Sequence, residues 1–204
     1  MFIPKCFAMS ERSQQQQFIR DFGFGIIVSD TLGGIHLPFV LREKEGTNGT
    51  LYTHCARENP HWQTLEGKDA LVIFTGPHSY ISPSWYRKGP AVPTWNYAAV
   101  HAYGKVSLLD DDTTLASLDS LVSQYEPELL VSRGILTDRI KARLLPAIVG
   151  FTVEISKLEG KLKLGQQRSP QDQQGVYQAL KQSKNIDDRA LAEYMSKIGL
   201  GTGE

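Results

Sequence analysis

The sequence predicts a mainly β protein with added helices (α+β), organised as an antiparallel barrel. β-rich runs follow one another through short turns, and helical patterns stand between and after these runs instead of alternating with them, which disfavours a doubly wound parallel sheet. The 204 residues suffice for one substantial domain with a small appendage. We expect a barrel domain over residues 1–165 and a C-terminal helical extension, packed on the barrel, over 166–204.

The first part of the chain reads as a short helix followed by a meander of strands. Ser10 is a suitable N-cap for a helix over 11–21, and β-rich runs follow at 23–30 and 35–43. Asn48-Gly49 predicts a hairpin with a type I′ turn, which needs positive φ at both central positions. Three consecutive antiparallel strands result.

The remainder of the chain contains further strands, with helices inserted between and after them, and one Pro-rich segment. Residues 76–95 contain four prolines and two tryptophans, and we expect an ordered loop there without a long regular element. The final residues, 199–204, are expected to fray. Strands are predicted at 69–77, 96–109 and 147–164, and helices at 60–67, 110–126, 138–145, 171–182 and 187–198.

Composition excludes several classes of protein. Lys plus Arg equals Asp plus Glu, 22 against 22, so the whole chain does not attract a polyanion and nucleic-acid binding would need a local patch. Two distant cysteines, Cys6 and Cys55, suit a reducing cytoplasm, and no run of apolar residues reaches membrane-spanning length. The spacing of histidines, cysteines and acids predicts no metal site, and no motif predicts a catalytic nucleophile.

A hydroxyl, an imidazole and a guanidinium stand together at the end of one predicted strand. Thr53, His54 and Arg57 precede a short helix, and hydroxyl, guanidinium and helix-start N–H groups together suit a phosphate. An alternative is that Arg57 pairs with a surface carboxylate and His54 fills a strand face. Residue type alone leaves both interpretations open.

Two later segments combine polar groups with aromatic residues or cations. Ser82, Ser84 and Trp85 lie in the Pro-rich segment, where a flavin could find an apolar shelf and hydrogen-bonding partners, although an aromatic residue there could equally anchor the loop. Lys161 and Lys163 share one face of a strand. They predict either an anion site or an ordinary solvated strand edge, where the lysine charges prevent aggregation through edge-to-edge strand pairing.

Several segments in order resemble the PaiB-type family, described as FMN-binding negative transcriptional regulators. The segments are MFIPKCFAM, HLPF, THCARENPHW, VIFTGPHSYISPSWY, VPTWNYAAVHAYG, IVGFTVEISKLEGKLKL and a trailing QR. The resemblance implies an antiparallel split β-barrel of the FMN-binding type, similar to pyridoxamine-phosphate-oxidase-like flavoproteins. It also implies a homodimer that binds FMN in a cleft between the subunits.

The resemblance also implies which residues hold the cofactor. It assigns a phosphate-side group, a loop group and a closing group, and these are Thr53, His54 and Arg57; Ser82, Ser84 and Trp85; and Lys161, Lys163 and Gln166. The chain has Leu162, Gly165 and Gln167 where the family more often has an aromatic residue, a serine and an asparagine.

Three functions remain compatible with the sequence. The first is a cytoplasmic negative transcriptional regulator whose partners are FMN and either DNA or another regulatory protein. The second is a small oxidoreductase using bound FMN. The third is a flavin-free binding dimer of the same fold, which the departures near Gly165 allow. We expect no membrane partner.

Overall fold

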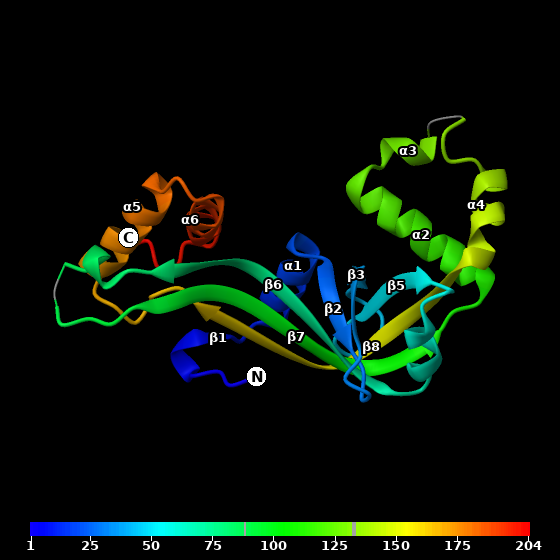
Figure 1. Ribbon diagram of the computed structural model, residues 1–204, viewed down its shortest axis with the longest axis horizontal. Coiled ribbons are helices and arrows are strands. Elements are labelled where there is room, and N and C mark those ends of the chain that lie inside the picture. Colours follow the sequence, from blue (N-terminus) through cyan, green and yellow to red (C-terminus); the bar gives the residue numbers. More distant parts are fainter. Residues whose placement is uncertain (88, 132–133) are drawn as a thin grey trace. The chain divides into compact units, whose positions relative to one another are not determined.

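The computed structural model describes residues 1–87, 89–131 and 134–204 (Figure 1). The helices are α1 (Arg12–Asp21), α2 (Asp111–Tyr125), α3 (Glu128–Val131), α4 (Asp138–Leu144), α5 (Pro170–Gln182) and α6 (Ile186–Ile198). The strands are β1 (Ala8–Met9), β2 (Phe24–Val28), β3 (Gly34–Pro38), β4 (Val40–Arg42), β5 (Thr50–Ala56), β6 (Asp69–Ile81), β7 (Thr94–Leu108) and β8 (Ile148–Lys163). Short 3-10 helices are η1 (Lys5–Phe7), η2 (Pro60–Thr64), η3 (Pro83–Trp85) and η4 (Leu145–Ala147).

The described strands form one eight-stranded sheet in the order β3-β2-β6-β7-β8-β5-β4, with β1 paired to β8 off this path. The β2–β3 and β4–β5 hairpins and the β5–β8 pair are antiparallel, and Thr53 lies opposite Phe151 in the β5–β8 register. The prediction of an antiparallel, mainly β fold with added helices is confirmed.

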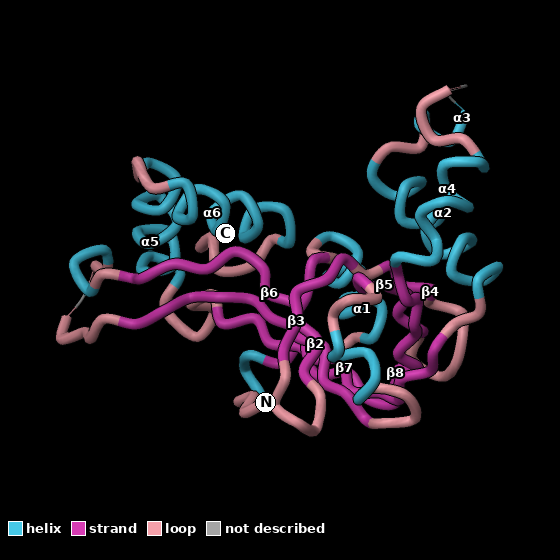
Figure 2. The backbone as a smooth tube through the Cα atoms, turned by 45° about the vertical axis from the view of Figure 1, so that its right-hand side comes forward, coloured by secondary structure: helices cyan, strands magenta, loops and turns pink. Residues whose placement is uncertain are grey.

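One compact unit comprises residues 12–74 and 101–158. Its core contains Phe18, Phe39, Phe74 and Phe151, each at most 2% exposed, and the rings of Phe39 and Phe74 meet edge to face at a centroid distance of 5.6 Å. Helix α2 starts at the predicted acidic cap, where the Asp110 carboxylate accepts a hydrogen bond from the Thr113 amide. It contacts β4 and β5, and Figure 2 shows α2 and α4 beside these strands.

The other unit comprises residues 1–11, 75–100 and 159–204. It contains the end of β6, the start of β7, the end of β8 and the helices α5 and α6, which pack against each other. Leu180 of α5 and Leu191 of α6 are fully buried, as the apolar spacing of each helix requires. Asn185 is the N-cap of α6, and its side chain accepts a hydrogen bond from the Asp187 amide. Gly199, in the left-handed conformation, is the C-cap.

The turn predicted at Asn48-Gly49 is wrong in type. The β4–β5 hairpin exists, but its loop spans residues 43–49, and the non-glycine residues with positive φ in the described chain do not include Asn48. The Asn48 amide instead donates to the carbonyl oxygens of Ile155 and Ser156, at 3.3 and 3.0 Å. The side chain therefore links the hairpin loop to β8 rather than closing a two-residue turn.

The Pro-rich segment is more regular than predicted, because strand β6 continues through Gly76 and Pro77 to Ile81. Strand β2 pairs with β6 between Leu71 and Ile73, before the proline is reached. A proline lacks a backbone donor, and its cost is small on a side of the strand where no ladder bond is needed. The predicted loop is confined to η3 and the described residues that follow it before Thr94.

The expected fraying of residues 199–204 is also wrong, because the tail packs on the end of β8 and on α5. Thr202 is 8% exposed. A Cβ built on Gly201 would lie 2.4 Å from the carbonyl oxygen of Leu164, and one on Gly203 would lie 2.4 Å from that of Pro170. The packing of the tail therefore requires glycine at positions 201 and 203.

None of the helices in the described ranges is long and apolar enough to cross a membrane. The division of the chain at residue 165 stays a prediction.

Gly201→Ala should lower the free energy of unfolding more than Gly199→Ala. Both glycines have positive φ, at +78° and +61°, but nothing lies within 4 Å of a Cβ on Gly199, so that variant isolates the conformational cost. We expect an additional loss of about 1–3 kcal/mol for Gly201→Ala from the clash with Leu164. Urea denaturation of both variants measures this difference, and equal losses would show that the tail is not held against β8.

Candidate functional site

The phosphate-side group lies at the end of β5, in the unit of residues 12–74 and 101–158. Thr53 is 2% exposed, and its hydroxyl donates to the carbonyl oxygen of Pro38 at 2.7 Å. His54 is half-buried, and burial lowers the pKa of its imidazole. Burial therefore favours the neutral form of His54 and leaves Arg57 as the cation of this group.

Arg57 is exposed and is oriented by backbone carbonyls. Its Nε donates to Pro146 at 2.7 Å, and its Nη2 donates to Ile148 at 2.8 Å. These bonds leave part of the five-donor guanidinium uncommitted in the described structure. The described residues provide no ion pair to Arg57, so the alternative of a surface carboxylate partner is not what the structure shows. Arg57 is therefore a cation that is oriented by two hydrogen bonds and has further N–H donors with which to bind an anion.

The closing group is centred on two lysines at the end of β8, in the unit that contains residues 75–100 and 159–204. Lys161 is 8% exposed. Its ammonium donates to the carbonyl oxygen of Phe2 at 3.1 Å and lies 5.1 Å from the ring centroid of Tyr97. Lys163 donates to the Thr94 hydroxyl at 2.6 Å and to the Trp95 carbonyl oxygen at 2.7 Å.

The two lysine charges are not compensated by a carboxylate within ion-pair distance anywhere in the described chain. Burial, and then the neighbouring charge of Lys161, lower the pKa of Lys163. Buried charges normally have a partner of opposite sign, because desolvation is costly. A bound anion would supply the negative charge that this lysine pair lacks.

Other predicted residues have structural roles in the same unit. Gln166 donates to the carbonyl oxygens of Leu162 and Cys6, at 2.6 and 3.0 Å, and accepts from the Leu164 amide at 2.9 Å. Its side chain closes the turn after β8. Gly165 in that turn has a φ of +85°, a conformation that favours glycine.

The serines of the loop group cap the short helix η3. Ser82 accepts from the Ser84 amide at 3.2 Å, and the two hydroxyls lie 2.8 Å apart. Trp85 follows them and lines a pocket with His78, Tyr80 and Trp95. Helix α5 fixes the position of this loop, because a Cβ on Gly175 would lie 2.4 Å from the Trp85 carbonyl oxygen.

The structure therefore places the nine predicted residues in two groups. Thr53, His54 and Arg57 belong to one compact unit, and the other six belong to the other unit. Their assignment to a cofactor stays a prediction. The sequence interpretation missed the partners of the lysines, Tyr97 and Thr94, and the acidic residues of the pocket, Asp187 and Asp188. The β7 residues could have been found from their two-residue alternation, whereas the acids lie more than 90 positions from the pocket's strand residues.

The antiparallel sheet with its added helices has the fold of the flavin-binding split barrels, as predicted. The family model described as "Putative FMN-binding domain" matches residues 1–157. The chain belongs to this family, which is the PaiB-type family that the sequence segments indicated. The family assignment confirms FMN as the cofactor.

Relatives match over nearly their full length. The chain is 35% identical over 203 residues to the protease synthase and sporulation protein PAI 2 of Bacillus subtilis, covering 96% of each protein. It is 30% identical over 255 aligned positions to an uncharacterized protein of Aspergillus fumigatus, covering 98% of each.

Solved structures show the same fold. The flavocytochrome Anf3 from Azotobacter vinelandii has a TM-score of 0.62 at 15% identity, over 78% of this chain and 71% of that one. The FAD and heme binding protein from Mycobacterium smegmatis has a TM-score of 0.59 at 16% identity, over 76% and 73%. At these identities the likeness shows the fold alone.

Proposed function

We propose that the protein is an FMN-binding homodimer that acts as a negative transcriptional regulator in the cytoplasm. The observation that carries the flavin part of this proposal is the lysine pair, Lys161 and Lys163, buried or half-buried without a carboxylate in the described chain. An anionic part of FMN would supply the missing negative charge. The adjacent aromatic residues of β7, Trp95 and Tyr97, offer apolar surface beside it.

The residues present fit FMN in two ways. In the described chain Lys161 has one carbonyl acceptor for three N–H donors, and Arg57 retains donors beyond its two carbonyl bonds, so both can bond anionic oxygens. When bound, FMN supplies a ring system that accepts and returns electrons, whereas the chain supplies charge, orientation and shielding from water. Ser82, Ser84, Trp85, Thr53, His54 and Gln166 remain proposed contacts.

The homodimer is proposed from the family resemblance. In the arrangement implied by the family resemblance, a phosphate-side group from one subunit and a closing group from its partner line the same cleft. Each subunit would then contribute to two sites. Dimerisation and flavin binding would depend on each other, because neither group alone encloses the ligand.

The regulatory role is supported by family membership and by the relative named as a sporulation protein. Formal net charge is zero, so general attraction to DNA is weak, and we propose contact through another regulatory protein or a local surface. The two cysteines are free, one exposed and one buried, in keeping with a reducing compartment.

Lys161→Gln and Lys163→Gln should each weaken FMN binding by about 10- to 150-fold, since each removes a charge-assisted contact worth about 1.5–3 kcal/mol. Lys163→Arg should retain most of the affinity. Affinity should fall as the pH rises through the lowered pKa of Lys163, because the neutral amine no longer attracts an anion. Quenching of FMN fluorescence during titration measures this. Lys105→Gln, an exposed lysine of β7, is the matched control, and unchanged uptake in the two test variants would refute the site.

Light scattering coupled to size-exclusion chromatography should give twice the chain mass of 22.7 kDa. Addition of FMN should shift a diluted sample toward that mass, because the ligand bridges both subunits. A monomer at all concentrations, still binding FMN with full affinity, would contradict the shared cleft.

Deletion of the gene should raise a defined set of transcripts, and the wild-type gene should restore repression while the Lys163→Gln variant should not. RNA sequencing measures this. Gel shifts across a salt titration then separate direct from indirect action: specific retardation at physiological salt indicates DNA contact, and none indicates a protein partner. An unchanged transcript profile in the deletion strain would remove the regulatory role while leaving FMN binding intact.

A further inference from the structure

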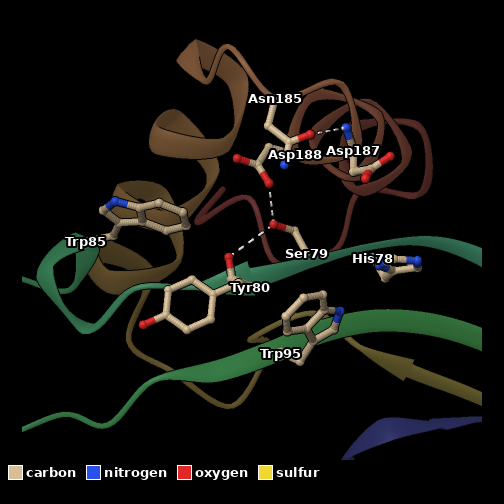
Figure 3. A pocket seen from close by; sticks show the side chains of 8 residues that line it. All are labelled: His78, Ser79, Tyr80, Trp85, Trp95, Asn185, Asp187 and Asp188. Carbon is tan, nitrogen blue, oxygen red and sulfur yellow. Dashed lines mark hydrogen bonds between the residues drawn. The ribbon is translucent and has the colours of Figure 1, made fainter.

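A pocket of about 260 Å³ lies within the unit that contains α5 and α6 (Figure 3). It is lined from β6, η3, β7 and the start of α6, by His78, Ser79, Tyr80, Trp85, Trp95, Asn185, Asp187 and Asp188. Trp85 is the one residue among the nine predicted flavin contacts that lines it. The pocket combines two kinds of chemistry, aromatic rings and carboxylates, that the flavin proposal does not use together.

The aromatic part of the pocket presents unusually open ring surface. Tyr80 and Trp95 are 47% and 48% exposed, although both are large side chains on long strands. Their rings meet edge to face at a centroid distance of 6.3 Å, and His78 lies 5.9 Å from Trp95. Rings arranged in this way leave electron-rich faces available to a ligand.

The acidic part of the pocket is rigidly held. The Asp188 carboxylate accepts hydrogen bonds from the hydroxyls of Ser79, which is 3% exposed, and of Ser183. Figure 3 shows the Ser79 bond between β6 and the start of α6. Asp187 is exposed beside it, and neither carboxylate has an ion-pair partner in the described chain.

Two cations bond residues of this lining or residues close to it in the chain. Arg189 follows Asp188 and donates to the carbonyl oxygen of Ser183 at 2.8 Å. The Lys163 ammonium binds the main-chain oxygen of Trp95, at 2.7 Å, and the Thr94 hydroxyl, not the ring of Trp95 and not a carboxylate. Neither cation forms an ion pair with Asp187 or Asp188 in the described chain.

We propose that this pocket binds an organic ammonium ion, either a primary alkylammonium or a quaternary ammonium. Aromatic faces attract such cations through the ring quadrupole, and a fixed carboxylate adds charge attraction. The FMN phosphate does not suit the pocket, because two carboxylates repel it. A hydrated inorganic cation does not suit it either, because such ions require several oxygen ligands and gain little from aromatic walls. The volume admits a small organic cation.

The test uses the full-length protein and two probes, n-butylammonium and tetramethylammonium, with n-butanol as the uncharged comparison. Isothermal titration calorimetry and the fluorescence of the pocket tryptophans report binding. We expect saturable binding of at least one ammonium ion and much weaker binding of n-butanol. Trp95→Leu should weaken the ammonium binding by about tenfold, because it removes a cation–π contact.

Variants of the two aspartates test whether their negative charge contributes to ammonium binding. Asp187→Asn should weaken ammonium binding by about fivefold or more, and it leaves the two serine bonds of Asp188 in place. Asp188→Asn should have a larger effect. Asp111→Asn is the matched control, because Asp111 is also an exposed carboxylate in the first turn of a helix, and it should change nothing.

The proposal is overturned if neither ammonium ion binds at millimolar concentration, or if n-butanol binds as well as n-butylammonium. It is also overturned if the Asp187 and Trp95 variants lose FMN but bind ammonium normally, since the pocket would then belong to the flavin. Loss of FMN binding in the lysine variants alone bears on the flavin proposal and leaves this one standing.

Discussion

The pairing of β8 with its neighbours is the constraint on which both the fold and the candidate site depend. This strand, Ile148–Lys163, forms seven register pairs with β5 from Thr50 to Ala56, and its later residues pair with β1. Because side chains alternate along a strand, a slip of one residue would move Lys161 and Lys163 to the opposite face. The backbone ladder thereby fixes where the two ammonium groups lie.

Charge is distributed unevenly in the unit that carries these lysines. The chain as a whole is neutral, yet the lysine pair lacks a carboxylate partner and the Asp187–Asp188 pair lacks a cation among the described residues. Partly buried charges without a partner of opposite sign lower stability, because desolvation is costly. Their separation is typical of surfaces that exchange water for ligands of opposite sign.

Local sequence rules predicted much of the fold and less of the site. Helices with capping residues and apolar spacing, such as α2 and α6, were found within one or two residues, because capping and periodicity act over short distances. The Asn48 turn and the packed tail were missed because their conformations depend on distant partners, Ile155 and Leu164.

The candidate site shows the same limit. Sequence alone could group Lys161 with Lys163, but it could not bring Ser79 to Asp188, which only folding places in contact. The family resemblance supplied the cofactor because it carries information about the whole fold rather than about single contacts.

The close approach of α5 to the pocket loop has an evolutionary consequence. The Trp85 carbonyl lies where any side chain at position 175 would stand, yet Gly175 falls outside residues 1–157, where the family model matches. The late helices are therefore not free to diverge independently of the barrel. A lineage that acquires a larger residue at 175 must reshape the turn around Trp85 in the same period, so drift in the helices can alter ligand preference without any replacement among the residues that touch the ligand.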